Sequence, residues 1–196
     1  MWSLDDKEMF RCYRQDVADT HMYCYNVLNL EMLDILNTKL NEALQKCVVN
    51  RDHWNLVESC LHAFTAVAEC IELENLYLPK LMVTLKNIPY ADLHQKVLCA
   101  ALDAIGSYSE WLCDHPEMLE NVMPLVISGL SNVDVSTNAT LALKDLTRNC
   151  QQYLHPYSDH TLAVSQVSIS INTCLLLEFL VFITKLSLHK ESLSVS

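Results

Sequence analysis

Glycine is nearly absent from this sequence, with two residues among 196. Sheets and ligand-binding loops depend on glycine for tight turns and for close approach of the backbone, so its scarcity argues against them and favours helices. The segment Gly106-Ser107-Tyr108-Ser109 does not match the G-x-S-x-G spacing of a hydrolase nucleophile. We expect its small residues to let neighbouring helices approach each other.

Basic residues are also few, since 13 lysines and arginines stand against 24 aspartates and glutamates and leave a net charge of −11. Nucleic-acid binding depends mainly on lysine and arginine contacts to phosphates, so this balance argues against a nucleic-acid partner. An acidic surface suits a basic protein partner, or serves solubility.

Motifs for catalysis, metal binding and disulfide frameworks are missing as well. Nine cysteines are dispersed without a C-x-x-C pair, and eight histidines show no H-E-x-x-H spacing. Cys60, Cys70 and Cys99 stand in apolar stripes, as expected of free cysteines that act as small buried hydrophobes. We therefore expect a reduced intracellular protein that is not an enzyme, with no catalytic residue, metal site or cofactor.

Long hydrophobic runs are absent too. The apolar run at residues 174–183 contains Glu178, and it is about half of the roughly 20 residues that a membrane span needs. Before it, apolar and polar residues alternate over 167–172, which is a strand-like period. We expect no membrane partner, and we expect residues 167–196 to form a divergent tail that packs less well than the rest.

What the sequence does contain is a pair of amphipathic helices. Residues 97–112 and 119–130 each carry apolar side chains three and four positions apart. Asp114-His115-Pro116 separates the two stripes, because a residue before proline is pushed out of the helical conformation. Two such helices cannot bury both stripes alone, so the pair should stack on copies of itself.

Copies of the first helix lie on both sides of it. A shift of 41 residues aligns Leu102 with Leu61 in one direction and with Leu143 in the other. The second helix recurs at an offset of 45 residues, which aligns Pro124 with Pro79. A period of about 40 to 47 residues is typical of HEAT and armadillo arrays. We predict an all-α fold, an α-α superhelix of hairpins of roughly 40–45 residues, with a non-repetitive helix bundle as the alternative.

Polar breaks divide the chain into these hairpins. We expect hairpins at residues 1–49, 50–88 and 89–131, an incomplete fourth hairpin at 132–166, and the tail at 167–196. Asp52 stands in the break before the second hairpin, where it can cap the following helix. Pro79 either kinks the helix that contains it or marks its first turn.

Acidic residues gather at the hairpin corners. Glu69 and Glu110 are equivalent under the 41-residue shift, and near the same corners stand Glu72, Glu74, Asp114, Glu117 and Glu120. Stacked hairpins would place these acids in rows along one edge, where they form a solvated rim or attract a basic partner. As candidate protein-binding residues we single out Glu69, Glu110, Asp114 and Glu117.

Several short sequence motifs resemble those of a known family. They are Phe10-Arg11-x-Tyr13-Arg14, Ala66-x-Ala68-Glu69, Ile105-Gly106-x-x-Ser109-Glu110-Trp111-Leu112 and Asp114-His115-Pro116. Over residues 1–166 the chain resembles a middle segment of the importin-β family of nuclear transport receptors, the karyopherins. The resemblance implies a right-handed superhelix of HEAT repeats. It also implies that the second helices, near residues 76–85 and 124–130, line the concave surface.

The resemblance carries functional expectations as well. Such receptors bind protein cargo, pass nucleoporins as they shuttle between cytoplasm and nucleus, and exchange cargo under the control of the Ran GTPase, without catalysing a reaction. We expect weak Ran binding by this segment, because it lacks the N-terminal repeats that hold most of the family's Ran contacts. The repeat pattern by itself also allows a generic helical-repeat scaffold or adaptor unrelated to transport.

Overall fold

The computed structural model describes residues 3–72, 74–158 and 161, and within them the chain is helical without any strand. The α-helices are α1 (Leu4–Leu28), α2 (Leu30–Val49), α3 (Trp54–Val67), α4 (Tyr77–Asn87), α5 (Gln95–Ser107), α6 (Ser109–Asp114), α7 (Leu119–Leu130) and α8 (Ser136–Cys150). The predicted all-α class is confirmed. The alternating stretch at 167–172 and the predicted tail at 167–196 lie outside the described residues.

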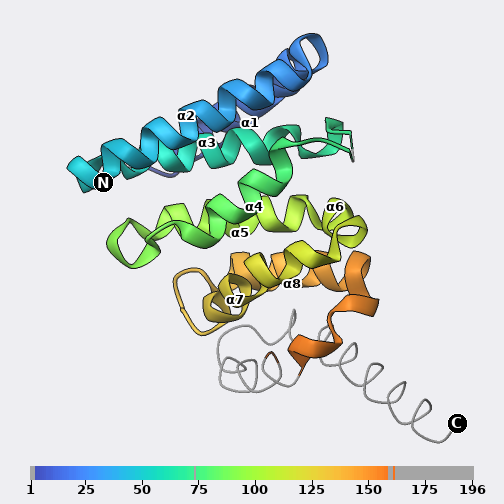
Figure 1. The fold of residues 1–196 in the computed structure, drawn as a ribbon. Helices are drawn as coiled ribbons and strands as arrows, with labels where there is room; N and C mark the ends of the chain where they lie inside the picture. Colours follow the sequence, from blue (N-terminus) through green and yellow to red (C-terminus); the bar gives the residue numbers. More distant parts are fainter. Residues whose placement is uncertain (1–2, 73, 159–160, 162–196) are drawn as a thin grey trace, which may run out of the picture.

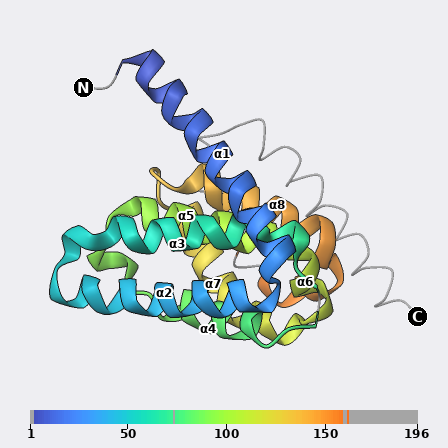
Figure 2. The ribbon, with the colours of Figure 1, turned by 90° about the horizontal axis from the view of Figure 1, so that it is seen from above.

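The helices form two layers that extend along one axis (Figures 1 and 2). One layer holds α1, α3, α5 with α6, and α8, and the other holds α2, α4 and α7. Within the first layer α3 packs against α5 and α5 against α8, and within the second α4 packs against α7. Each helix pair therefore covers the apolar side of the pair before it, which is the arrangement of a solenoid.

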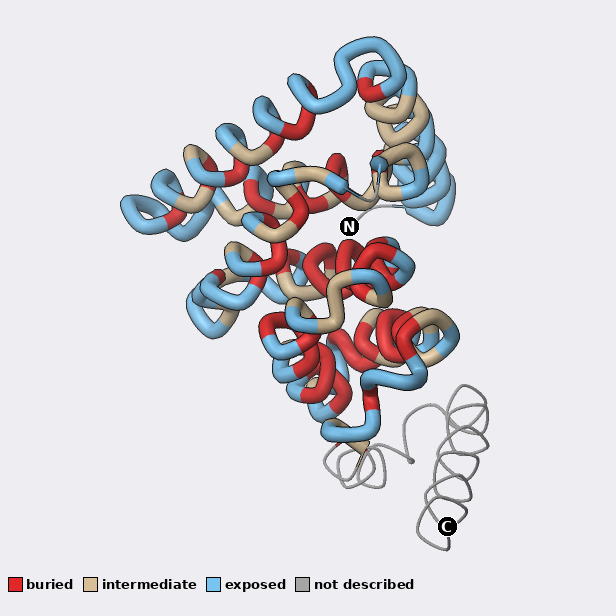
Figure 3. The backbone as a smooth tube through the Cα atoms, turned by 45° about the vertical axis from the view of Figure 1, so that its right-hand side comes forward, coloured by how far each residue is buried: buried red, intermediate tan, exposed pale blue. Residues whose placement is uncertain are grey.

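The buried residues form one continuous cluster along the described stack (Figure 3). Leu61, Leu102 and Leu143, which the 41-residue shift aligns, are 0%, 0% and 3% exposed. In the second layer Leu81 and Leu85 are also fully buried. The repeated stripes of the sequence are thus the two sides of a single core, and the predicted core role of Leu102 is confirmed.

Residues 97–112, expected as one helix, are divided at Tyr108. This residue has φ −95° and ψ 16° and separates α5 from α6. Its buried hydroxyl donates to the carbonyl oxygen of Phe64 in α3 over 2.7 Å. That carbonyl is available because α3 tightens into a 3-10 turn at its end, where the N–H of Ala68 donates to Thr65 instead. The break between α5 and α6 therefore involves a contact with a residue 44 positions away, and the helix periodicity of the sequence does not predict such a contact.

Both glycines lie where helices approach closely. A Cβ on Gly106 would stand 3.2 Å from Cα of Ala142, so α5 and α8 meet at their backbones. A Cβ on Gly129 of α7 would stand 3.0 Å from Cβ of Ala139 and 3.2 Å from a methyl carbon of Leu102. The close helix approach expected at Gly106 is confirmed, and Gly129 adds a second one.

Two of the predicted helix boundaries agree with the structure, and one predicted helix cap does not. Pro79 is the third residue of α4 and so belongs to its first turn, and α6 ends at Asp114 as expected. The predicted cap by Asp52 is wrong. An extra 3-10 turn, Arg51–His53, precedes α3, and the side chain of Asn50 caps it by accepting the N–H of Asp52 over 3.0 Å. Asp52 therefore lies inside a turn instead of in front of the helix.

Polar bonds join successive helix pairs in the first layer. Each links residues 35 to 44 positions apart, which is about one repeat. They are Arg14 with Glu58, Phe64 with Tyr108, Gln95 with Asp134, Asp103 with Asn138, Ser109 with Asn149 and Ser109 with Cys150. The sequence period is thus visible as a series of contacts between neighbours.

Candidate protein-binding surface

Glu69 and Glu110 line one cleft of about 790 Å³ on the layer of first helices. Glu69 lies in the 3-10 turn Ala68–Cys70 that follows α3, and Glu110 lies in the first turn of α6. Because α3 packs against α5, residues 41 positions apart come to the same side of the stack. Both side chains are exposed, and the ion pairs within the described ranges involve neither carboxylate.

Two further acids complete this acidic cleft, Asp19 of α1 and Asp145 of α8. Asp19 accepts a hydrogen bond from Gln15 over 3.1 Å, and Asp145 pairs with Arg148 over 3.2 Å. The charged lining residues are four carboxylates and one guanidinium. The cleft therefore has a negative potential that favours basic side chains of a partner.

Asp114 and Glu117 do not line the acidic cleft. Asp114 is the last residue of α6, Glu117 lies in the 3-10 turn Pro116–Met118, and both side chains are exposed. The structure thus divides the four predicted residues into a cleft pair, Glu69 and Glu110, and a corner pair, Asp114 and Glu117.

Sequence reasoning missed Asp19 and Asp145 as parts of the cleft. Asp145 stands three residues before Arg148 on a predicted helix, and that spacing indicates an ion pair on one helix face. This signal was available from the sequence. No comparable signal existed for Asp19, because α1 crosses the other helices at an angle that the 41-residue shift does not describe (Figure 2).

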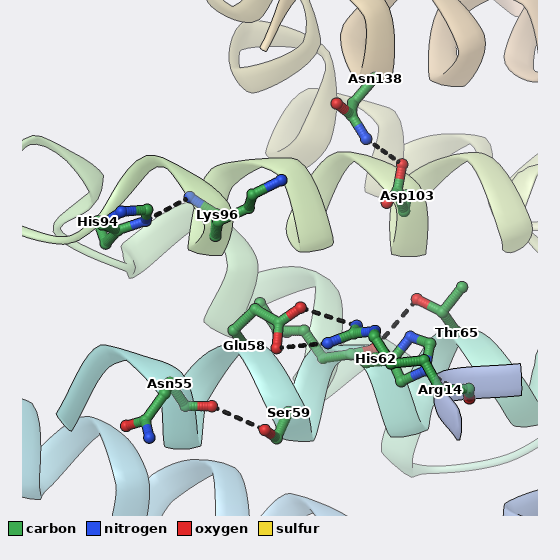
Figure 4. Close-up of polar contacts among 11 residues, drawn as sticks. Arg14, Asn55, Glu58, Ser59, His62, Thr65, His94, Lys96, Asp103 and Asn138 are labelled. Carbon is green, nitrogen blue, oxygen red and sulfur yellow. Dashed lines mark hydrogen bonds and ion pairs between the residues drawn. The ribbon is translucent and has the colours of Figure 1, made fainter. Parts of the chain in front are cut away.

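A second cleft, of about 500 Å³, lies between α1, α3, α5 and α8. Arg14 of α1 reaches across to Glu58 of α3 with contacts of 2.8 and 3.1 Å (Figure 4). Asn138 of α8 donates to the carboxylate of Asp103 in α5 over 2.7 Å. The charges in this cleft are therefore largely matched within the protein, in contrast to the acidic cleft.

The pKa values of two titratable groups in the second cleft are shifted. The pKa of His62 is lowered by loss of water and by the nearby Arg14 cation. The pKa of the Asp103 carboxyl is raised, mainly by burial, although the hydrogen bond from Asn138 opposes the shift. Each shift favours the neutral form.

Among the described residues no group of three His, Cys, Asp or Glu side chains could hold a metal ion. In the same part of the chain, no helix has the length and apolar character needed to cross a bilayer.

Comparison with known proteins identifies the family. Residues 1–31 match the family model described as Importin 13 repeat, and residues 75–164 match the one described as Transportin-3/Importin-13 third TPR domain. The chain is 37% identical to importin-13 of Gallus gallus and 36% identical to importin-13 of Homo sapiens, in alignments over 171 residues that cover 84% of this chain. The chain belongs to the importin-β family of nuclear transport receptors.

A solved importin-13 structure, in the cytosolic state, is similar to this importin-β-family chain with a TM-score of 0.81 and 43% identity. The match covers 86% of this chain and 19% of that one. The mRNA transport regulator MTR10 of Saccharomyces cerevisiae is 25% identical over 165 residues. The predicted resemblance and the HEAT-type solenoid are confirmed. The chain spans 17% of the length of the importin-13 relatives it matches.

Proposed function

We propose that this chain is a segment of a receptor that binds protein cargo for Ran-GTP-regulated passage through nuclear pores. The identity of 36–37% to importin-13 over 84% of the chain carries the proposal. A solenoid supports it, because successive helix pairs build an extended surface on which a folded partner can lie. In this role the chain binds and releases partners without catalysis, and shuttles between cytoplasm and nucleus past nucleoporins.

In this proposal cargo lies against the second layer, on the side of α4 and α7. The acidic cleft opens on the first layer, and the corner pair stands at the turn between α6 and α7. A basic segment of the partner that reaches around this edge would meet Asp114 and Glu117 first and Glu69 and Glu110 next. Charges at the rim of an interface mainly accelerate association and fix register.

Charge reversal in the complete receptor tests the assignment. We expect Glu69→Lys with Glu110→Lys to slow association with a basic cargo by about tenfold at low salt, and to flatten the dependence of the rate on ionic strength. Reversal of Asp114 and Glu117 should have a smaller effect of the same sign. Asp16→Lys is the matched control, because Asp16 is exposed on α1 and lines neither cleft.

The two parts of the proposal fail in different ways. If the cleft pair can be reversed without any change in association rate or salt dependence, the acids form only a solvated rim. The receptor role is tested separately by titrating Ran-GTP against the isolated chain and against the complete receptor. We expect weak binding to the chain and tight binding to the receptor, and tight capture of Ran-GTP by the chain alone would refute this division of roles.

A further inference from the structure

The amino-terminal half of α1 leaves the body of the molecule and opens a groove. α1 crosses the other helices at an angle, and its first turns extend beyond them (Figure 2). Tyr25, near the carboxyl end, is the one buried residue of this helix. Where α1 diverges, a groove of about 510 Å³ lies between α1, α2 and α3. We name it the α1 groove.

Apolar side chains from all three helices line the α1 groove. They are Phe10, Tyr13 and Val17 of α1, Leu36 and Ala43 of α2, and Leu56, Cys60 and Ala63 of α3. The three residues of α1 are three and four positions apart, so they share one face of the helix. Tyr13 is 62% exposed, and its ring stacks on that of Phe10 with centroids 6.4 Å apart. One apolar face of α1 thus borders the open groove.

An ion pair holds α1 in this position. Arg14 makes two contacts with Glu58 of α3, at 2.8 and 3.1 Å, and most of both side chains is buried. A ring nitrogen of His62 lies 3.5 Å from the carbonyl oxygen of Arg14 on the same side. A bidentate guanidinium–carboxylate pair fixes orientation as well as distance. The groove is therefore built into the fold by contacts between α1 and α3.

The side of the α1 groove that α2 forms is positively charged. Lys39 and Lys46 both line the groove and are two turns apart, about 10 Å along the helix axis. Glu42 between them pairs with Lys39 over 2.9 Å at an exposed position, where an ion pair contributes little. Arg14 also lines the groove, but Glu58 matches its charge as Glu42 matches that of Lys39, so Lys46 is the lining cation without an ion pair among the described residues. Its charge is opposite to that of the acidic cleft.

We propose that the α1 groove binds an amphipathic helix of a partner protein, with apolar residues on Tyr13 and Val17 and acidic residues facing Lys39 and Lys46. The apolar lining fits a helix that carries its anchors at i, i+3 or i+4, and i+7. The two lysines select carboxylates that are about two turns apart along that helix. The site is separate from the proposed cargo contacts and does not depend on them.

Two pools of synthetic helical peptides, about 14 residues long, test the proposal with the full chain. Members of one pool carry Leu, Ile or Phe along one face and glutamates two turns apart beside it, and the matched pool carries lysines in place of the glutamates. Peptides enriched on the immobilised chain are then titrated by fluorescence anisotropy. We expect enrichment from the glutamate pool, with affinity lowered about tenfold by Tyr13→Ala and about two- to fivefold by Lys46→Gln.

Tyr23→Ala and Lys7→Gln are the matched controls, because both side chains are exposed on α1 outside the groove. They should leave the affinity unchanged, and thermal unfolding of every variant checks that it folds. Failure of both pools, equal enrichment from the lysine pool, or unchanged affinity in Tyr13→Ala would overturn the proposal. So would sedimentation showing that Tyr13→Ala abolishes self-association of the chain, because a second copy would then be the occupant.

Discussion

The hydroxyl of Tyr108 donates to the backbone carbonyl oxygen of Phe64 over 2.7 Å, and this bond ties the junction of α5 and α6 to the end of α3. Tyr108 is buried, and burial raises the pKa of its phenol well above the ordinary value. The phenol therefore stays a neutral donor throughout the physiological pH range. One side chain thus satisfies a carbonyl that the tightened end of α3 leaves without its usual helical partner.

Tyr108→Phe should destabilise the fold although it removes a single oxygen. The carbonyl of Phe64 would lose its donor in a buried place, which costs about 1–3 kcal/mol. Denaturation by urea measures the change in unfolding free energy. The control is Tyr23→Phe, because Tyr23 is 73% exposed. Equal stability of the two variants would show that the carbonyl finds another donor.

Leu102→Ala should be among the most damaging truncations in the chain. Leu102 is fully buried at a position that recurs in three helix pairs, so its loss leaves a cavity that neighbours on both sides cannot fill. Losses at such sites are about 2–5 kcal/mol. Leu76→Ala, at a side chain that is 79% exposed, is the comparison. If both variants unfold at the same urea concentration as the parent, the repeated stripe is not the core.

Gly129→Ala tests the close approach of α7 to its neighbours. Alanine is favoured over glycine in a helix by about 1 kcal/mol, but overpacking costs about 1–3 kcal/mol. Since the new Cβ would stand 3.0 Å from Cβ of Ala139, we expect net destabilisation. Adding Ala139→Gly should restore part of the loss in calorimetry. A stabilised single variant would mean that the helices separate without cost.

His62 should make the fold sensitive to mild acid. Its pKa is lowered from 6.5 by burial and by Arg14, so below that pH the unfolded chain takes up a proton that the folded chain does not. The unfolding free energy contributed by this group therefore falls as the pH falls below 6.5. His62→Gln should reduce the loss of stability between about pH 7 and pH 5, whereas His155→Gln, at an exposed side chain, should not. Parallel pH profiles for parent and His62→Gln would contradict this.

The layers of the fold could be predicted from sequence because each helix pair meets the same burial requirement. Leu61, Leu102 and Leu143 recur at a fixed interval since each lies on the inward face of a first helix. The break at Tyr108 could not be predicted, because its partner is a carbonyl released by the 3-10 end of another helix. The cap at Asn50 was missed because one extra turn moved Asp52 out of place.

The candidate site was predictable only in part for a related reason. Glu69 and Glu110 line the same cleft because they occupy equivalent positions in successive repeats, and the 41-residue interval between them can be read from the sequence. Asp19 joins them because of the angle at which α1 crosses the other helices. Contacts between residues far apart in the sequence determine that angle, and the ion pair of Arg14 with Glu58 is one of them. A periodic pattern contains no information about that angle.

The bonds between helix pairs, each spanning 35 to 44 residues, also bear on the mechanics of the chain. Each helix pair contacts only the pairs before and after it, so a small rotation between two pairs adds to the rotations at the other junctions along the stack. A bend of the stack is therefore shared among several junctions instead of falling on one. The hydrogen bond from Tyr108 to Phe64 then bears only the share of its own junction.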